Sequence, residues 1–93
     1  MSAPLFPLGA VVATPGALEA LAEARVPPLT LLRRHASGDW GELDAHDRRE
    51  NAKSLKAGWR LLSSYRVGEN GEKVWIITEA DRSSTCVLLP SEY

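Results

Sequence analysis

Two groups of histidine and aspartate are the residues of this sequence that could bind a metal ion. His35 lies four positions before Asp39, and His46 lies between Asp44 and Asp47. Imidazole nitrogens and carboxylate oxygens are common metal ligands. Neither group has the His-x-x-x-His spacing that places two imidazoles on one face of a helix. We therefore expect no metal centre and no cofactor, and we interpret His35 as a cap at the C-terminal end of a helix.

Covalent catalysis needs a nucleophile, a base and an orienting group that the fold brings together. The single cysteine, Cys86, lies in the apolar run at residues 85 to 89, where a thiol is usually a small buried hydrophobic group. No Gly-x-Ser-x-Gly elbow and no glycine-rich phosphate loop is present in the sequence. The sequence therefore predicts no catalytic residues. A small hydrolase that uses His35 or His46 is the least favoured alternative.

Basic residues cluster between positions 48 and 60. Arg49, Lys53 and Lys56 share one side of a predicted helix, and Arg48 and Arg60 lie nearby. Such a stripe could contact phosphates, although cations on a helix face are usually solvated or paired with neighbouring acids. Single-stranded nucleic acid would also need exposed aromatic side chains beside the cations. Because we expect Trp59 to be buried in the core, nucleic-acid binding through this stripe is the alternative function.

Trp40 stands between two turn-forming residues, Asp39 and Gly41. A large aromatic side chain in such a place either folds back onto the core or stands out as an anchor for a partner. Folding back is slightly favoured, and both interpretations remain open. If the ring is exposed, the loop with Trp40, Asp39 and the neighbouring His35 is the candidate protein-binding surface. A protein-interaction or regulatory module is therefore the function we expect first.

The first two thirds of the chain predict one strand and three helices. Residues 8 to 13 are apolar and β-branched, and Thr14 followed by Pro15 is typical of a helix start. A first helix should extend to about residue 25, and Pro28 should open a second that ends near Gly38. Asp44 should cap a third helix from 45 to about 57, and Gly58 should end it. Its apolar side, which we expect to face the core, consists of Ala45, Ala52, Leu55 and Trp59.

The last third of the chain changes to the pattern of β-strands. Residues 60 to 67, 73 to 78 and 85 to 89 are rich in β-forming side chains and are separated by turn-forming segments. Asn70-Gly71 indicates a short hairpin. We therefore predict an α+β fold with an N-terminal strand, about three helices and a C-terminal three-stranded antiparallel meander. Together the strands should form one mixed or antiparallel sheet packed on helices, with the position of the first strand left open.

Length and composition favour one small intracellular domain over residues 1 to 93. A chain of 93 residues with 44% hydrophobic and 25% charged residues is typical of a single globular domain. The net charge of −1 provides no overall attraction to nucleic acid or to an acidic membrane. A single cysteine fits a reducing compartment, and no apolar run is long enough to span a bilayer. We expect a cytoplasmic protein without membrane contact, either a monomer or a weak homodimer.

Two stretches resemble a family of short proteobacterial proteins. They are RHASGDWGELD at residues 34 to 44 and VWIITEADRSSTCVLLPSEY at residues 74 to 93. They are similar to the plasmid-related proteins, which are associated with plasmids and integrated mobile elements, and the resemblance spans about residues 29 to 93. It implies a bacterial cytoplasmic accessory protein and brings no catalytic residues to this sequence. The interpretation of the first 28 residues depends on the residue pattern alone.

Overall fold

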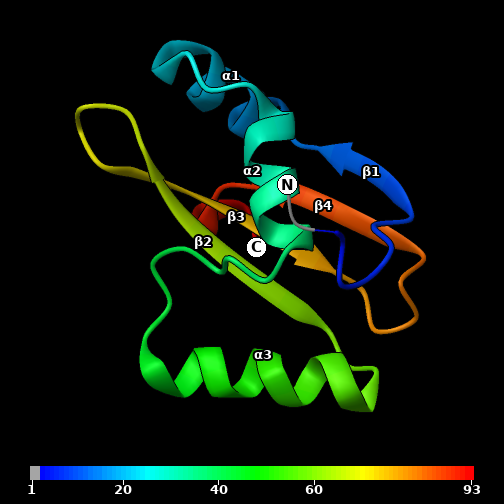
Figure 1. The fold of residues 1–93 in the computed structure, drawn as a ribbon. Coiled ribbons are helices and arrows are strands. Elements are labelled where there is room, and N and C mark those ends of the chain that lie inside the picture. The colour runs from blue at the N-terminus through cyan, green and yellow to red at the C-terminus, as the bar shows by residue number, and fades with distance from the viewer. Residues whose placement is uncertain (1–2) are drawn as a thin grey trace.

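The computed structural model describes residues 3–93 and has the predicted α+β fold (Figure 1). Its elements, in chain order, are β1 Ala10–Ala13, α1 Pro15–Ala24, α2 Pro28–Ala36, α3 Ala45–Ala57, β2 Leu61–Val67, β3 Glu72–Thr78, β4 Ser84–Leu88 and the 3-10 turn η1 Pro90–Glu92. Within this part of the chain, no helix has the length and apolar character needed to cross a membrane.

The four strands form one mixed sheet in the order β1-β4-β3-β2. β2, β3 and β4 make the predicted antiparallel meander, with Ser63 opposite Ile76 and Ile76 opposite Val87. β1 adds to the outer side of β4 and is parallel to it, with Val12 opposite Cys86. The sheet therefore has β1 at one edge and β2 at the other (Figure 1).

The predicted helix boundaries follow from local capping. The Thr14 side chain accepts a hydrogen bond from the Ala17 amide at 3.1 Å, and the Asp44 side chain accepts one from the Asp47 amide at 2.8 Å. These caps satisfy amides that have no partner within the helix. Gly58 ends α3 in the left-handed conformation. The turn between β2 and β3 is longer than the Asn70-Gly71 motif indicates, because its left-handed residues are Gly68 and Gly71.

One face of the sheet carries the hydrophobic core. Alternate residues of β2, β3 and β4 point to the side that α1 and α2 cover, and Leu21 and Leu31 pack against them from the helices. The buried apolar side chains of the strands on this face are Leu61, Tyr65, Val67, Val74, Ile76 and Val87. This core holds α2 and the loop after it against the sheet.

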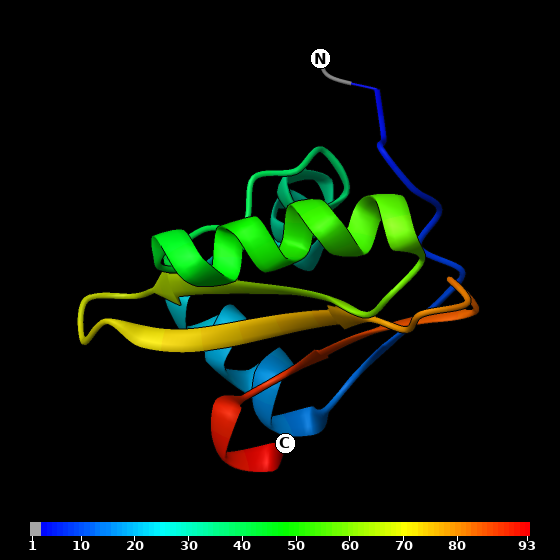
Figure 2. The same cartoon turned by 90° about the horizontal axis from the view of Figure 1, so that it is seen from below.

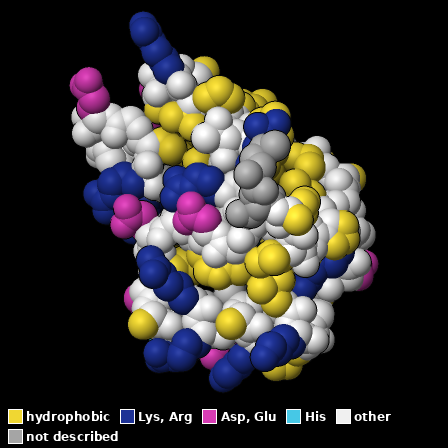
Figure 3. All heavy atoms as spheres, in the orientation of Figure 1, with side chains coloured by type: hydrophobic (Ala, Val, Ile, Leu, Met, Phe, Trp, Pro, Cys, Tyr) yellow, Lys and Arg dark blue, Asp and Glu magenta, His cyan; other side chains and the backbone are white. Residues whose placement is uncertain are grey.

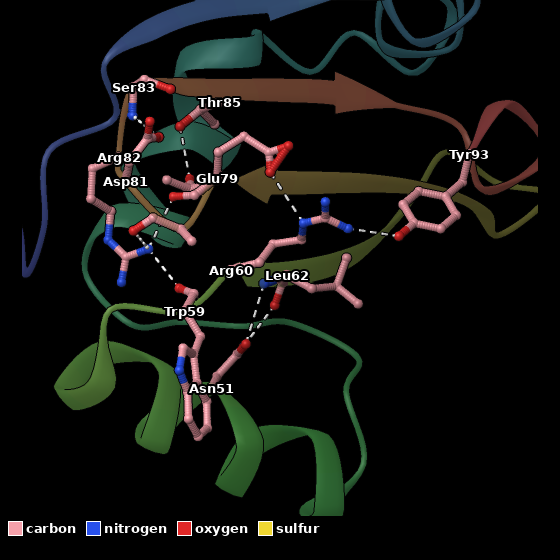
Figure 4. Close-up of polar contacts among 12 residues, drawn as sticks. Asn51, Trp59, Arg60, Leu62, Glu79, Asp81, Arg82, Ser83, Thr85 and Tyr93 are labelled. Carbon is pink, nitrogen blue, oxygen red and sulfur yellow. Dashed lines mark hydrogen bonds and ion pairs between the residues drawn. The ribbon is translucent and has the colours of Figure 1, made fainter.

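α3 lies along the edge of the sheet beside β2 (Figures 1 and 2). The prediction that α3 contacts the core through an apolar side is wrong. The buried residues of α3 are Asn51 and Ser54, whereas Trp59 is 54% exposed. The reason is the partner that α3 meets. Asn51 Nδ2 donates to the Leu62 carbonyl at 2.6 Å, and the Leu62 amide donates to Asn51 Oδ1 at 3.2 Å (Figure 4). A strand edge presents backbone polar groups, so an amide side chain fits there better than an apolar one.

The loop after α2 completes the cover of this edge. The Ser64 amide donates to the Trp40 carbonyl at 3.1 Å, and the Glu42 amide donates to the Ser64 carbonyl at 2.6 Å. Gly41 sits between these bonds with a φ of +75°, and a Cβ there would lie 2.1 Å from the Ser64 carbonyl oxygen. The backbone of β2 is therefore paired at its outer edge at both Leu62 and Ser64.

Candidate functional site

His35 forms the centre of a buried chain of hydroxyl groups. Its Nδ1 lies 2.5 Å from Ser63 Oγ, and its Nε2 lies 2.9 Å from Thr78 Oγ1. Thr78 Oγ1 lies 2.7 Å from Thr85 Oγ1, and the Thr85 hydroxyl donates to the Leu8 carbonyl at 2.7 Å. The four side chains that form this hydrogen-bonded series have no measurable solvent exposure. It ties α2 to β2, β3, β4 and the segment before β1.

The direction of each hydrogen bond in this chain follows from its last member. A carbonyl can only accept, so the Thr85 proton goes to Leu8, and the Thr85 oxygen accepts from Thr78. The Thr78 oxygen must then accept from His35 Nε2–H, and His35 Nδ1 accepts from Ser63. His35 is therefore a neutral imidazole with its proton on Nε2. Burial, with a contribution from the positive charge of Arg82, lowers the pKa of His35 to about 4.

These contacts give His35 a structural role. The interpretation of its side chain as a helix cap is wrong, because the ring points from α2 into the sheet. The ring also cannot contact a partner protein, because it is fully buried. A buried polar network of this kind is stable only when each member is satisfied, and here each one is. The sequence signal that could have identified it is the set of Ser and Thr on the core-facing side of three strands.

Trp40 folds back onto the molecule. Its ring is stacked on Phe6 with 6.3 Å between centroids and lies 5.8 Å from the His35 ring. Asp39 accepts hydrogen bonds from Arg34 Nε at 2.6 Å and Nη2 at 3.3 Å, and the Arg34 guanidinium lowers the pKa of Asp39. The Tyr65 hydroxyl donates to the Asp39 carbonyl at 2.6 Å. Of the two interpretations of this loop, the structure therefore favours the one in which it packs on the core.

An apolar groove lies next to this loop, and the sequence analysis did not predict it. It encloses about 460 Å³ between the segment before β1 and the outer side of α2. Its lining residues are Pro4, Leu8, Leu29, Leu32, Arg33, Arg34, Ala36 and Ser37. Leu29 is 55% exposed, and Arg33 and Arg34 are the charged residues of the lining. The groove could accept an apolar side chain with a negative charge beside it.

The five basic residues predicted as a nucleic-acid surface do not share one face. Arg48 donates to the carbonyls of Leu43 and Gly41 at 3.0 and 3.1 Å and so fixes the loop before α3. Arg60 lies apart from α3, between Glu79 at 3.1 Å and the Tyr93 hydroxyl at 2.8 Å (Figure 4). These two cations are therefore engaged in intramolecular hydrogen bonds on the surface.

Arg49, Lys53 and Lys56 remain together on the exposed side of α3, opposite Asn51 and Ser54. Basic side chains are visible along α3 in the space-filling view (Figure 3). Lys53 forms an ion pair with Glu50, with 3.6 Å between Nζ and Oε1. We call these three cations the α3 basic face.

Trp59 lies close to the α3 basic face along the chain. It follows Gly58, and its indole is directed away from the strands (Figure 4). Its carbonyl accepts a hydrogen bond from Arg82 at 2.6 Å, which fixes the backbone while the ring stays 54% exposed. The expectation that Trp59 is buried is therefore wrong, and an exposed aromatic side chain accompanies the cations.

The second histidine group is on the surface and separate from His35. Ligand atoms of Asp44, His46 and Asp47 lie within 4.8 Å of one another, and all three residues are exposed. The Asp44 carboxylate already caps α3 through the Asp47 amide.

Cys86 lies on β4, only partly buried, and burial raises the pKa of its thiol. A raised pKa disfavours the reactive thiolate.

Comparisons of the chain with protein-family models, with curated proteins and with solved structures gave no match.

Proposed function

We propose that this chain is a small non-enzymatic accessory protein that binds a segment of a partner protein in the groove between α2 and the segment before β1. The observation that carries the proposal is the groove itself, an apolar hollow with two arginines in its lining. Such a hollow with a few placed polar groups is the usual form of a binding site. A bacterial, plasmid-related origin and a cytoplasmic location are part of the proposal through the resemblance of residues 29 to 93.

The charges around the groove define the occupant. Arg34 forms an ion pair with Asp39, with 2.6 Å between Nε and Oδ2. No acidic side chain of residues 3–93 forms an ion pair with Arg33. An arginine beside an apolar pocket favours a carboxylate on the partner. The expected partner segment therefore carries a leucine-like side chain followed or preceded by Asp or Glu.

Trp40 supports this surface from behind. Phe6 is buried against both the Trp40 ring and the His35 ring, at 6.3 and 5.2 Å between centroids. The Leu5 amide also donates to the Ala36 carbonyl at 2.7 Å. These contacts fix the segment that contributes Pro4 and Leu8 to the groove. We therefore revise the interaction surface from the Trp40 loop to the groove that this loop positions.

A non-enzymatic role is supported by His35 and Asp39, whose polar groups are already bonded within the protein. His35 is enclosed with both ring nitrogens bonded, and Asp39 is paired with Arg34. Catalysis would need such groups to be open to a substrate.

The groove can be tested with anilinonaphthalene sulfonate, which combines an apolar aromatic body with one negative charge. We expect saturable fluorescence enhancement, and Leu29→Asp or Arg33→Glu should weaken binding about tenfold or more, because each removes one half of the recognition. Leu18→Asp is the matched control, since Leu18 is a similarly exposed leucine outside the groove lining. Equal binding by all four proteins, with unchanged circular dichroism, would reject the groove as the site.

A second candidate function is binding of single-stranded nucleic acid by the α3 basic face. The exposed Trp59 ring favours it, because stacking of bases on an aromatic ring accompanies backbone contacts in this class of proteins. Three phosphate contacts should give a slope of roughly −2 in a plot of log affinity against log salt concentration.

A labelled oligothymidylate and fluorescence anisotropy test this second candidate. The triple change Arg49→Gln, Lys53→Gln and Lys56→Gln should remove most of the salt dependence. Trp59→Ala should weaken binding about tenfold or more. Lys73→Gln, at an exposed cation on β3, is the control and should bind as the unchanged protein does. Affinity that survives the triple change would exclude this face.

A further inference from the structure

The two edges of the sheet differ in how they are protected. At the β2 edge, Asn51 pairs with Leu62, and the Trp40 loop pairs with Ser64. No such cover is present at the β1 edge in the described part of the chain, where Val11 and Val12 are 47% and 53% exposed. Natural proteins usually protect an edge strand with a charge, a proline, a bulge or a covering segment. Residues 8 to 14 contain no charged residue and no proline.

The backbone of β1 has outward groups at defined positions. The Ala10 amide donates to the Ser83 carbonyl at 3.0 Å, and the Thr14 amide donates to the Val87 carbonyl at 2.9 Å. Residues 10, 12 and 14 therefore direct their polar backbone groups toward β4, since these groups alternate along a strand. Val11 and Ala13 direct theirs outward.

We infer that β1 is the contact between two copies of this chain, which pair their β1 strands antiparallel across a two-fold axis perpendicular to the sheet. In this register Val11 of one copy faces Ala13 of the other, and each of the two pairs exchanges two backbone hydrogen bonds. Val12 lies on the axis and faces Val12 of the second copy. The contact would join two four-stranded sheets into one.

Three observations favour a second copy as the occupant. The strand carries no charge, so like pairs with like without repulsion, and the net charge of −1 adds little repulsion between whole molecules. An antiparallel pair of identical strands also matches every outward donor with an acceptor by symmetry. In contrast, β1 has no polar side chain that could select an unrelated strand. The strand has only 4 residues, and stable dimers usually bury about 800 Å² per partner, so we expect a dimer that dissociates on dilution.

Sedimentation velocity over a series of protein concentrations tests the dimer, and variants at position 12 test its register. Val12→Lys should weaken association about tenfold or more, as should Val12→Glu, because like charges then face each other on the axis. An equimolar mixture of the two variants should associate again as a heterodimer. Val11→Pro should also give a monomer, because it removes an outward amide and leaves the bonds to β4 intact.

Hydrogen exchange of individual amides supplies the second readout. The amides of Val11 and Ala13 should become protected as the concentration rises, whereas the amide of Val12 should be protected at every concentration. A protein that stays monomeric at all concentrations would overturn the inference. A dimer in which the Val11 and Ala13 amides remain fast, or in which the mixture of variants does not associate, would overturn it equally. The result is independent of the groove, because Val12 is not among the groove-lining residues.

Discussion

Acidification from pH 6.5 to about pH 4 is expected to lower the free energy of unfolding through His35 by about 3 kcal/mol. In the folded protein, burial lowers the pKa of His35 from 6.5 to about 4, so the ring stays neutral until the pH approaches 4. In the unfolded chain the ring binds a proton below about pH 6.5. The unfolded state therefore binds more protons between the two pKa values, and stability falls as the pH falls.

Urea unfolding at a series of pH values measures this loss. Small domains have a total stability of about 5–15 kcal/mol, so the expected change is a large fraction of it. His35→Gln is the control variant, since its amide can donate to Thr78 and has no proton to gain in this range. We expect this variant to be less stable at neutral pH and to lose the part of the pH-dependent slope that His35 contributes between pH 6.5 and pH 4. An unchanged slope in the variant would show that other groups cause the effect.

The second large effect is expected at Gly41. Gly41→Ala should lower the free energy of unfolding by about 3 kcal/mol or more, because it combines backbone strain with a steric clash. The backbone has a φ of +75°, and the new Cβ would lie 2.1 Å from the Ser64 carbonyl oxygen. To relieve the contact, the Trp40 loop must move away from the edge of β2.

Gly58→Ala is a matched control for this change. Gly58 has nearly the same φ, +76°, but a Cβ there has no neighbour within 4 Å. It should cost about 1 kcal/mol, which is the effect of strain alone. Chemical denaturation of both variants gives the comparison. Equal losses would mean that the pairing of the Trp40 loop with Ser64 contributes little to stability.

The sequence predicted those parts of the fold that depend on local signals. Thr14 and Asp44 cap the helices as expected, and the meander of β2, β3 and β4 is confirmed. Such signals act over a few residues and are readable from neighbours alone. The parallel pairing of β1 with β4 joins positions more than seventy residues apart, at Ala10 and Ser84. No local pattern specifies which strand a distant segment will join.

The errors concern the direction in which side chains point. We assigned the core side of α3 by hydrophobicity, but α3 packs on the backbone edge of β2, where Asn51 is the better residue. Trp59 was expected to be buried because of its size, but it follows the end of α3 at Gly58, where Arg82 binds its carbonyl and its ring stays 54% exposed. His35 was placed at the surface as a cap, because the Ser63, Thr78 and Thr85 hydroxyls that satisfy it come from three separate strands. Each error involves a partner that is distant in the sequence.

The groove escaped prediction for the same reason. Pro4 and Leu8 come from the segment before β1, and Leu29 and Arg33 come from α2. The two walls are held together by Phe6, which packs on Trp40 and His35, and by the hydrogen bond from the Leu5 amide to the Ala36 carbonyl. Trp40 was predicted as a partner-binding residue, but its ring packs on Phe6 and His35 and so supports one wall of the proposed groove.

The most direct test of groove binding is photo-crosslinking from position 29 in bacterial cells that express the protein. With benzoylphenylalanine in place of Leu29, we expect mass spectrometry to identify one crosslinked segment of another protein with an apolar residue beside Asp or Glu. The crosslink should be lost when Arg33→Glu is added. The same label in place of Lys56 should not reach that segment. No protein crosslink from position 29, together with crosslinks to nucleic acid from position 56, would contradict the account and favour the α3 basic face.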